Sequence, residues 1–123
     1  MPFPFVNGDV LNASDMNALN RLPPNVWSGS GTLGLSNEAT WISLQPGSAA
    51  TVTIPPDSSV AFPAGAQILI GRNTTQTVTI ARGSGVSLYG TLGQRNYTIA
   101  NPDGFVTLLK YASNHWYIMG DVA

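Results

Sequence analysis

Regular alternation of apolar and polar residues, interrupted by frequent turn residues, is the feature that most limits the folds open to this chain. It is clearest in Ala50-Thr51-Val52-Thr53-Ile54, where three apolar residues fall on one side and two threonines on the other. Successive side chains of a strand point to opposite faces, so a period of two residues indicates a half-buried β-strand. From Asn25 onward the sequence therefore predicts an all-β domain.

Short connections between the apolar runs predict which strands pair. Residues 66–71 and 76–82 flank Arg72-Asn73-Thr74-Thr75, and residues 105–112 and 115–120 flank Ser113-Asn114. Each pair is expected to form an antiparallel hairpin. The predicted fold is an antiparallel β-sandwich or jelly-roll-like domain that covers residues 25–123.

Two further patterns refine this expectation. The runs at 105–112 and 115–120 carry apolar residues on both faces, which is typical of strands that are central or covered by a neighbour. No period of 20 to 50 residues repeats along the chain, so a solenoid or a propeller is not expected.

The N-terminal segment contains the one clear helical signal. Asn12 is a good N-cap, and Asp15 stands where an acid favours the helix dipole. Leu11 and Met16 have the spacing of a hydrophobic staple. We expect a helix over residues 13–20, which is too short to be stable alone in water, so its apolar side must dock on another surface.

Charged residues make up only 9% of the sequence, compared with about 25% in an average soluble domain. The surface must therefore be built from uncharged polar residues and some apolar ones. Extended surfaces of this kind associate in water, which predicts that other copies or a larger assembly cover much of it.

Several classes of protein are disfavoured by composition. A net charge of −1 leaves no basic footprint for nucleic acid, and the absence of cysteine excludes disulfides and thiolate metal sites. The sequence shows neither a secretory signal nor an apolar run of about 18 residues that could span a membrane. We expect a soluble protein that folds in the cytoplasm of the cell that makes it, with no cofactor.

No pattern points to catalysis. Gly29-Ser30-Gly31-Thr32-Leu33-Gly34 matches a dinucleotide-binding motif in its letters, but a strand rather than a helix is expected after it. His115 is the only histidine, which excludes a site with several histidine ligands. Most of the six carboxylates stand beside turn residues and serve as caps and turn formers: Asp9, Asp15, Glu38, Asp57, Asp103 and Asp121. We therefore expect a protein that is not an enzyme.

Sugar recognition is the main alternative that the residues suggest. Aromatic side chains could form a platform for sugar rings, although in a small β-domain such residues more often belong to the core or to an interface. Polar loops held by a scaffold are better candidates for surface contacts. The expected glycan or receptor contacts are Arg72, Asn73, Tyr89, Arg95, Asn96 and Tyr97.

Two parts of the sequence resemble proteins of bacteriophage virions. The opening FVNGDVLNASDMN, residues 5–17, resembles the F-x-x-G-x-V-L-T-A-x-D-x-N start of tail-fibre, tailspike and other appendage proteins. The PAGAQI, VTIARGSGV and WYIMGD runs, which begin at Pro63, Val78 and Trp116, are similar to a β-domain of the same class. Together these matches cover about two thirds of the chain.

The resemblance implies a structural role. In that class the opening segment helps to attach the protein to the particle, and the β-domain assembles as a homotrimer. Residues 1–24 would then be an attachment segment that contacts capsid, portal, adaptor or tail proteins. The residues expected to make this contact are Phe3, Phe5, Asp9, Leu11, Asp15, Met16 and Leu19. The chain is short for a tail fibre, which favours a capsid decoration protein or a small connector.

Overall fold

The computed structural model describes residues 24–38 and 40–123 and consists almost entirely of β-strands. The strands are β1 (Pro24–Trp27), β2 (Gly31–Thr32), β3 (Trp41–Leu44), β4 (Ala50–Ile54), β5 (Gln67–Arg72), β6 (Val78–Arg82), β7 (Ser87–Gly90), β8 (Gly93–Gln94), β9 (Tyr97–Thr98), β10 (Phe105–Ala112) and β11 (His115–Gly120). A single 3₁₀ turn, η1 (Leu35–Asn37), connects β2 to β3 within these residues. The all-β class is confirmed. The expected helix over 13–20 lies outside the described residues.

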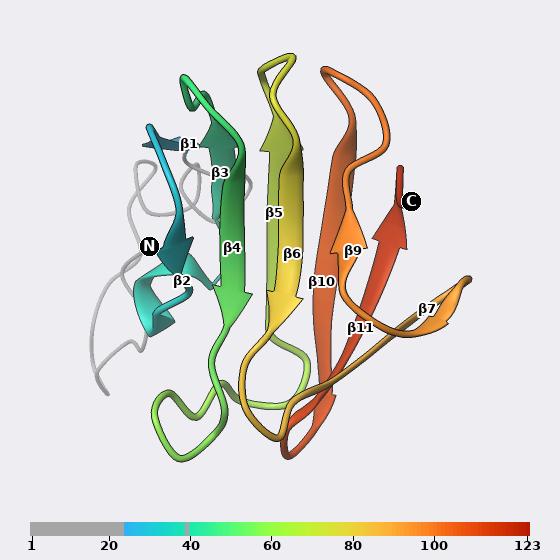
Figure 1. Ribbon diagram of the computed structural model, residues 1–123. Helices are drawn as coiled ribbons and strands as arrows, with labels where there is room; N and C mark the ends of the chain where they lie inside the picture. Colours follow the sequence, from blue (N-terminus) through green and yellow to red (C-terminus); the bar gives the residue numbers. More distant parts are fainter. Residues whose placement is uncertain (1–23, 39) are drawn as a thin grey trace, which may run out of the picture.

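The strands form two sheets that lie one in front of the other (Figure 1). The larger has seven strands in the order β1-β3-β5-β10-β11-β7-β8, and the smaller has four in the order β2-β4-β6-β9. Both sheets are mixed, because each contains parallel and antiparallel neighbours. The prediction of an antiparallel fold was therefore wrong.

The parallel pairs arise because the chain winds three times between the two sheets. β1, β3 and β5 are parallel neighbours in one sheet, and β2, β4 and β6 are parallel neighbours in the other (Figure 1). Each winding thus adds one strand to each sheet. The predicted hairpin of residues 66–71 with 76–82 was wrong for the same reason, since β5 and β6 belong to different sheets.

The windings have unequal lengths. Trp41 pairs with Leu69 and Ala50 pairs with Val78, an offset of 28 residues in both sheets. The first winding is shorter: Pro24 pairs with Trp41, an offset of 17 residues. These unequal offsets agree with the absence of a fixed period in the sequence.

The C-terminal part closes the domain with antiparallel pairs. β10 lies between β5 and β11 and is antiparallel to both, and β9 is antiparallel to β6. The predicted hairpin of residues 105–112 with 115–120 is confirmed. Asn114 in its turn has a φ of 53°, a left-handed conformation that asparagine adopts more readily than most residues.

The core lies between the two sheets and is formed by alternate residues of each strand. Its fully buried side chains include Ile42 and Leu44 of β3, Val52 and Ile54 of β4, Ile68 and Ile70 of β5, Ile80 of β6 and Leu108 of β10. Trp116 is also fully buried, and its ring meets that of Phe62 edge to face with centroids 5.3 Å apart. The alternation read from the sequence thus identifies the inward faces correctly.

Candidate interaction surface

The two sheets present very different outer faces to their surroundings. On the four-stranded sheet the outward positions are taken by small, mostly hydroxyl-bearing residues, which we call the threonine face: Thr32, Thr51, Thr53, Thr79, Ala81 and Thr98. Threonine suits a strand that faces water, because its branched side chain fits the pleat while its hydroxyl stays hydrated.

The outer face of the seven-stranded sheet is apolar instead. Its residues alternate with the core residues of β3, β5, β7, β10 and β11. We call this set the apolar face: Trp41, Leu69, Tyr89, Phe105, Leu109, Tyr111, His115, Tyr117 and Met119. None of these residues is a lysine, arginine, aspartate or glutamate. Monomeric proteins seldom leave such a set of neighbouring apolar side chains in water, so this face is the strongest candidate for an interaction surface.

Register explains why the apolar residues are contiguous. Leu69 of β5 stands beside Trp41 of β3 on one side and Thr107 of β10 on the other, and Thr107 pairs with Met119 of β11. Neighbouring strands are about 4.8 Å apart, so directly paired side chains touch across the sheet. Trp41 and Leu69 are therefore neighbours across the sheet, as are Leu109 and Tyr117, and Thr107 lies between Leu69 and Met119.

Gly71 supports one end of this face. A Cβ atom at Gly71 would lie 2.9 Å from the indole nitrogen of Trp41 and would also meet the ring of Phe105. These two rings lie 5.9 Å apart between centroids. The glycine in the middle of a strand is explained by this close approach, which lets two aromatic rings lie against the sheet.

Four rings gather at the other end of the apolar face, and we call them the tyrosine cluster: Tyr89, Tyr111, His115 and Tyr117. His115 is central, with its ring centroid 4.9 Å from Tyr89, 5.2 Å from Tyr111 and 5.3 Å from Tyr117. Tyr111 is 63% exposed and Tyr117 is 38% exposed. Spacings of this size are usual for interacting rings, so the cluster forms a preorganised aromatic patch at the surface.

His115 has one ring nitrogen that is buried within the described part of the chain. Its Nε2 atom is enclosed and has no hydrogen-bond partner among the described residues. A catalytic histidine needs a nucleophile or an orienting acid within hydrogen-bond reach. Across residues 24–38 and 40–123, no group of three or more His, Asp or Glu side chains could hold a metal ion.

Arg72, one of the expected surface contacts, is buried and has a structural role. Its guanidinium donates to the carbonyl oxygens of Gln76 at 2.8 Å, Thr75 at 2.9 Å and Ile99 at 2.9 Å. These bonds secure the loop that carries the chain from β5 to β6. Its guanidinium makes four hydrogen bonds to backbone carbonyls and the side chain is buried, so the structure does not support the prediction of Arg72 as a glycan or receptor contact.

Two of the remaining polar candidates also bond within the domain. The side-chain amide of Asn73 donates to the hydroxyl of Ser43. Asn96 accepts at its Oδ1 atom from the backbone N–H of Arg82 at 2.9 Å. Arg95 is exposed, and its guanidinium carbon lies 5.9 Å from the ring centroid of Tyr97. Arg95 is therefore the candidate in these loops with the most freedom to contact another molecule.

The two tyrosine candidates have opposite positions. Tyr97 is fully buried, and its hydroxyl donates to the carbonyl of Gly93. Its ring faces are therefore closed to a sugar. Tyr89 lies at the surface in the tyrosine cluster, and its strand pairs with β8 so that Tyr89 stands beside Gln94. The structure thus groups Tyr89 with Tyr111, His115 and Tyr117, a set that sequence reasoning did not assemble.

A buried ion pair lies beneath the tyrosine end of the domain. Lys110 is only 2% exposed, and its ammonium group lies 2.8 Å from the Asp57 carboxylate and 2.8 Å from the carbonyl of Phe62. The hydroxyl of Ser113 also donates to Asp57, at 3.0 Å. Bonding to Lys110 lowers the pKa of the Asp57 carboxyl from its ordinary value. The pair ties the loop after β4 to the β10–β11 hairpin.

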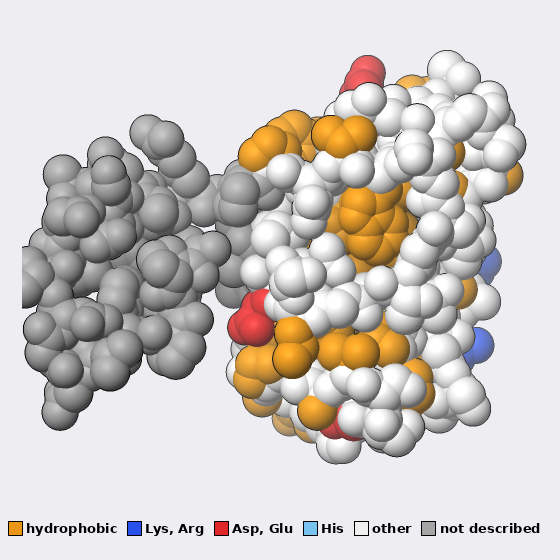
Figure 2. Space-filling view, turned by 90° about the vertical axis from the view of Figure 1, so that its left-hand side faces the viewer, with side chains coloured by type: hydrophobic (Ala, Val, Ile, Leu, Met, Phe, Trp, Pro, Cys, Tyr) orange, Lys and Arg blue, Asp and Glu red, His pale blue; other side chains and the backbone are white. Residues whose placement is uncertain are grey.

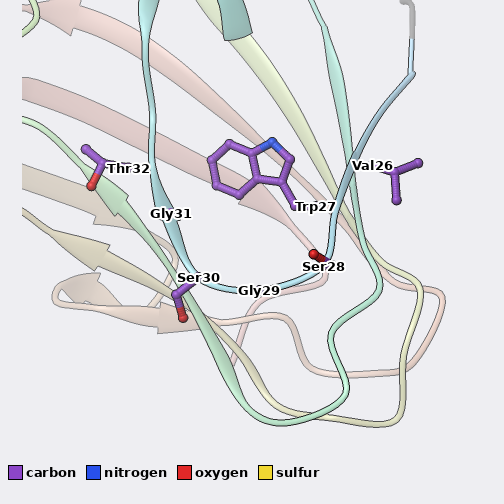
Figure 3. Close-up of a pocket in the computed structure, with 7 residues that line it drawn as sticks. All are labelled: Val26, Trp27, Ser28, Gly29, Ser30, Gly31 and Thr32. Atoms are coloured by element: carbon purple, nitrogen blue, oxygen red, sulfur yellow. The ribbon is translucent and has the colours of Figure 1, made fainter.

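The edge formed by β1 and β2 contains a hollow of about 340 Å³, lined by Val26 through Thr32. Figure 3 shows the Trp27 ring turned into it while Val26 points to the opposite side of β1. Figure 2 shows hydrophobic atoms recessed among uncharged ones on this side of the molecule. The dinucleotide-like motif begins in this hollow. Gly29 lies in a bend, and Gly31 and Thr32 form the short strand β2, so the motif does not open the helix that would bind a pyrophosphate.

The residues expected to attach the protein to a virion, Phe3, Phe5, Asp9, Leu11, Asp15, Met16 and Leu19, all lie outside the described residues. In the part of the chain that the structure describes, no helix is long and apolar enough to cross a membrane. No protein-family model matches the chain, and a search of curated proteins found no match.

Proposed function

We propose that this chain is a non-enzymatic structural protein of a bacteriophage virion, a small homotrimeric tail-fibre, spike or capsid-decoration component attached to the particle through residues 1–24. It would be made in the host cytoplasm and incorporated into the particle. We also class its two-layer domain as a β-sandwich with parallel windings, because the windings do not match the antiparallel path of a jelly roll.

The observation that carries the proposal is the difference between the two outer faces. One sheet presents threonines, and the other presents nine neighbouring apolar or aromatic residues without a full charge. A protein that acts by assembly needs such a face, since apolar burial drives association. The low charge of the whole chain and the virion-like opening segment support the same role.

Deletion of residues 1–24 tests the attachment. Particles assembled with the full chain should carry it, and particles assembled with residues 25–123 should lack it, as measured by quantitative mass spectrometry of purified virions. Light scattering of the free protein measures the oligomer. Retention of the shortened chain on particles would contradict attachment through residues 1–24, and a monomer at micromolar concentration would contradict the trimer.

The tyrosine cluster favours a second function, adsorption to host surface glycans. Exposed aromatic rings can stack on the apolar faces of sugars, and Tyr111 is the most open ring in the cluster. Binding on a glycan array that disappears in Tyr111→Ala would support this function. An array without signal for the full chain would exclude it for the sugars displayed.

A further inference from the structure

We infer that the apolar face is the surface through which copies of this chain contact one another, and that the contact is head to tail. In this arrangement the β1–β3–β5 side of one copy meets the tyrosine cluster of the next. The inference rests on the trimer of the proposed function and identifies the surface that builds it.

The chemistry of the face favours a protein partner over a sugar. Between the tyrosine cluster and Trp41 the surface contains Leu69, Leu109 and Met119, with Gln67 and Thr107 paired beside them. A sugar lying over the three apolar side chains would lose hydrogen bonds to water without replacement from them, which is costly. Another apolar protein surface has few hydrogen bonds to water to lose.

The absence of charge favours a second copy as that partner. Two copies of a surface without full charges can approach without repulsion between like groups, and the surface offers no charge by which a basic or acidic partner could be recognised. Homo-oligomer interfaces are also the more apolar class of protein interface. Charged groups near this face are directed elsewhere: Lys110 is buried against Asp57 beneath it.

The size of the face is also suitable. Within the face Tyr111 is 63% exposed, Met119 47%, Phe105 39% and Tyr117 38%, and Val26 of β1, which lies beside the face, is 64% exposed. At the 150–250 Å² that an aromatic side chain can bury, the three aromatic residues among them leave on the order of 300 Å² uncovered. A stable interface buries about 800 Å² on each partner, so the half-buried residues between them and a polar rim would complete it.

The head-to-tail arrangement follows from the trimer. A ring of three copies cannot be built from two-fold contacts in which a patch meets itself, so each copy must use two different patches. The apolar face has two chemically different ends. Val26 and Trp41 lie at one end, and Tyr89, Tyr111 and Tyr117 lie at the other.

Lysine substitutions test the surface in the full chain. Met119→Lys places a charge in the middle of the apolar face, where a long exposed side chain can remain hydrated in a single copy, so the fold should be preserved. Thr79→Lys places the same charge in a central strand of the threonine face and serves as the matched control. Light scattering should give a threefold lower mass for Met119→Lys and an unchanged mass for Thr79→Lys, with far-UV circular dichroism of both like that of the unmodified chain.

Each other result has a distinct meaning. A monomeric unmodified chain would overturn the proposed trimer itself. A trimeric unmodified chain that stays trimeric as Met119→Lys would overturn the choice of surface and leave the trimer intact. Loss of the trimer in both variants would show that the contact is not confined to the apolar face and would overturn the inference.

Cross-linking tests the head-to-tail arrangement, and the absence of native cysteine makes the chain suitable for it. The two most exposed apolar side chains at opposite ends of the face are Val26 and Tyr111. With a short thiol-specific cross-linker, the double variant Val26→Cys/Tyr111→Cys should form covalent species of three chains, whereas each single variant should stay uncoupled. Covalent dimers of a single variant, or no coupling in the double variant, would overturn the arrangement.

Discussion

At the scale of single residues, the side chains that carry charge are used mainly to hold the fold together. Lys110 is buried against Asp57, and Arg72 is buried among backbone carbonyls. A buried charge is tolerated only when it is paired and hydrogen-bonded, and both residues meet that requirement. Lys110, Asp57 and Arg72 therefore stabilise loops of the described domain.

The Asp57–Lys110 pair should make stability depend on pH in the acid range. The pKa of Asp57 is lower in the folded protein than in the unfolded chain, so its contribution is complete above the unfolded pKa and is lost as the pH falls through the folded pKa. The melting temperature should fall as the pH is lowered from about 5 to about 2. In Asp57→Asn the fall over the same range should be smaller.

Removing the carboxylate should also destabilise the protein at neutral pH. Asp57→Ala leaves Lys110 buried without its counter-ion and should cost about 3 kcal/mol of unfolding free energy. Ser113→Ala, which removes one hydrogen bond to the same carboxylate, should cost about 1 kcal/mol. Urea denaturation measures both. Equal small losses in the two variants would contradict a stabilising role for the pair.

At the scale of secondary-structure elements, the strands of the larger sheet have two apolar faces with different purposes. Ile70 of β5 is fully buried between the sheets, while its neighbour Leu69 lies on the apolar face. Alternation in β4 separates a core face from the threonine face, but in β5, β10 and β11 it separates a core face from the apolar face. Alternate residues of a single strand therefore lie in the core and on the apolar face.

Ile70→Ala and Leu69→Ala should have different effects, one on the stability of the protomer and the other on association. Ile70→Ala should lower the unfolding free energy of the protomer by about 3 kcal/mol, because it opens a cavity in the core. Leu69→Ala should change protomer stability by less than about 1 kcal/mol and raise the concentration at which the trimer dissociates. Urea denaturation and sedimentation equilibrium measure the two quantities. If the two variants changed the unfolding free energy and the dissociation concentration equally, the assignment of Ile70 to the core and Leu69 to the contact surface would be contradicted.

At the scale of the whole molecule, an apolar outer face links stability to assembly. If copies cover this face for one another, folding of the protomer and formation of the trimer are coupled by mass action. The melting temperature should then rise with protein concentration over a hundredfold range. The same series with Met119→Lys should show no rise, and a constant melting temperature in both proteins would contradict the coupling.

The sequence by itself determined the strands and their inward faces. Residues 50–54, 105–112 and 115–120 are strands at the expected positions, because a period of two and turn residues act locally. The sequence also signalled that 105–112 and 115–120 are apolar on both faces, which is the pattern of the apolar face. It missed the short strands β1, β2 and β8, where the runs are too short for a period to be recognised.

Only the tertiary structure decided how the strands pair. A short loop after β5 can either reverse the chain within one sheet or carry it across to the other, and the residues 73–77 permit both. The crossing is selected by distant contacts, such as the bond from Arg72 to the carbonyl of Ile99, which no local pattern contains. The same is true of the tyrosine cluster, since Tyr89, Tyr111 and Tyr117 come from three strands that only the folded sheet brings together. Local patterns determine which residues form strands. Strand pairing depends instead on the total apolar surface that the domain buries, which is defined only when all the strands are in place.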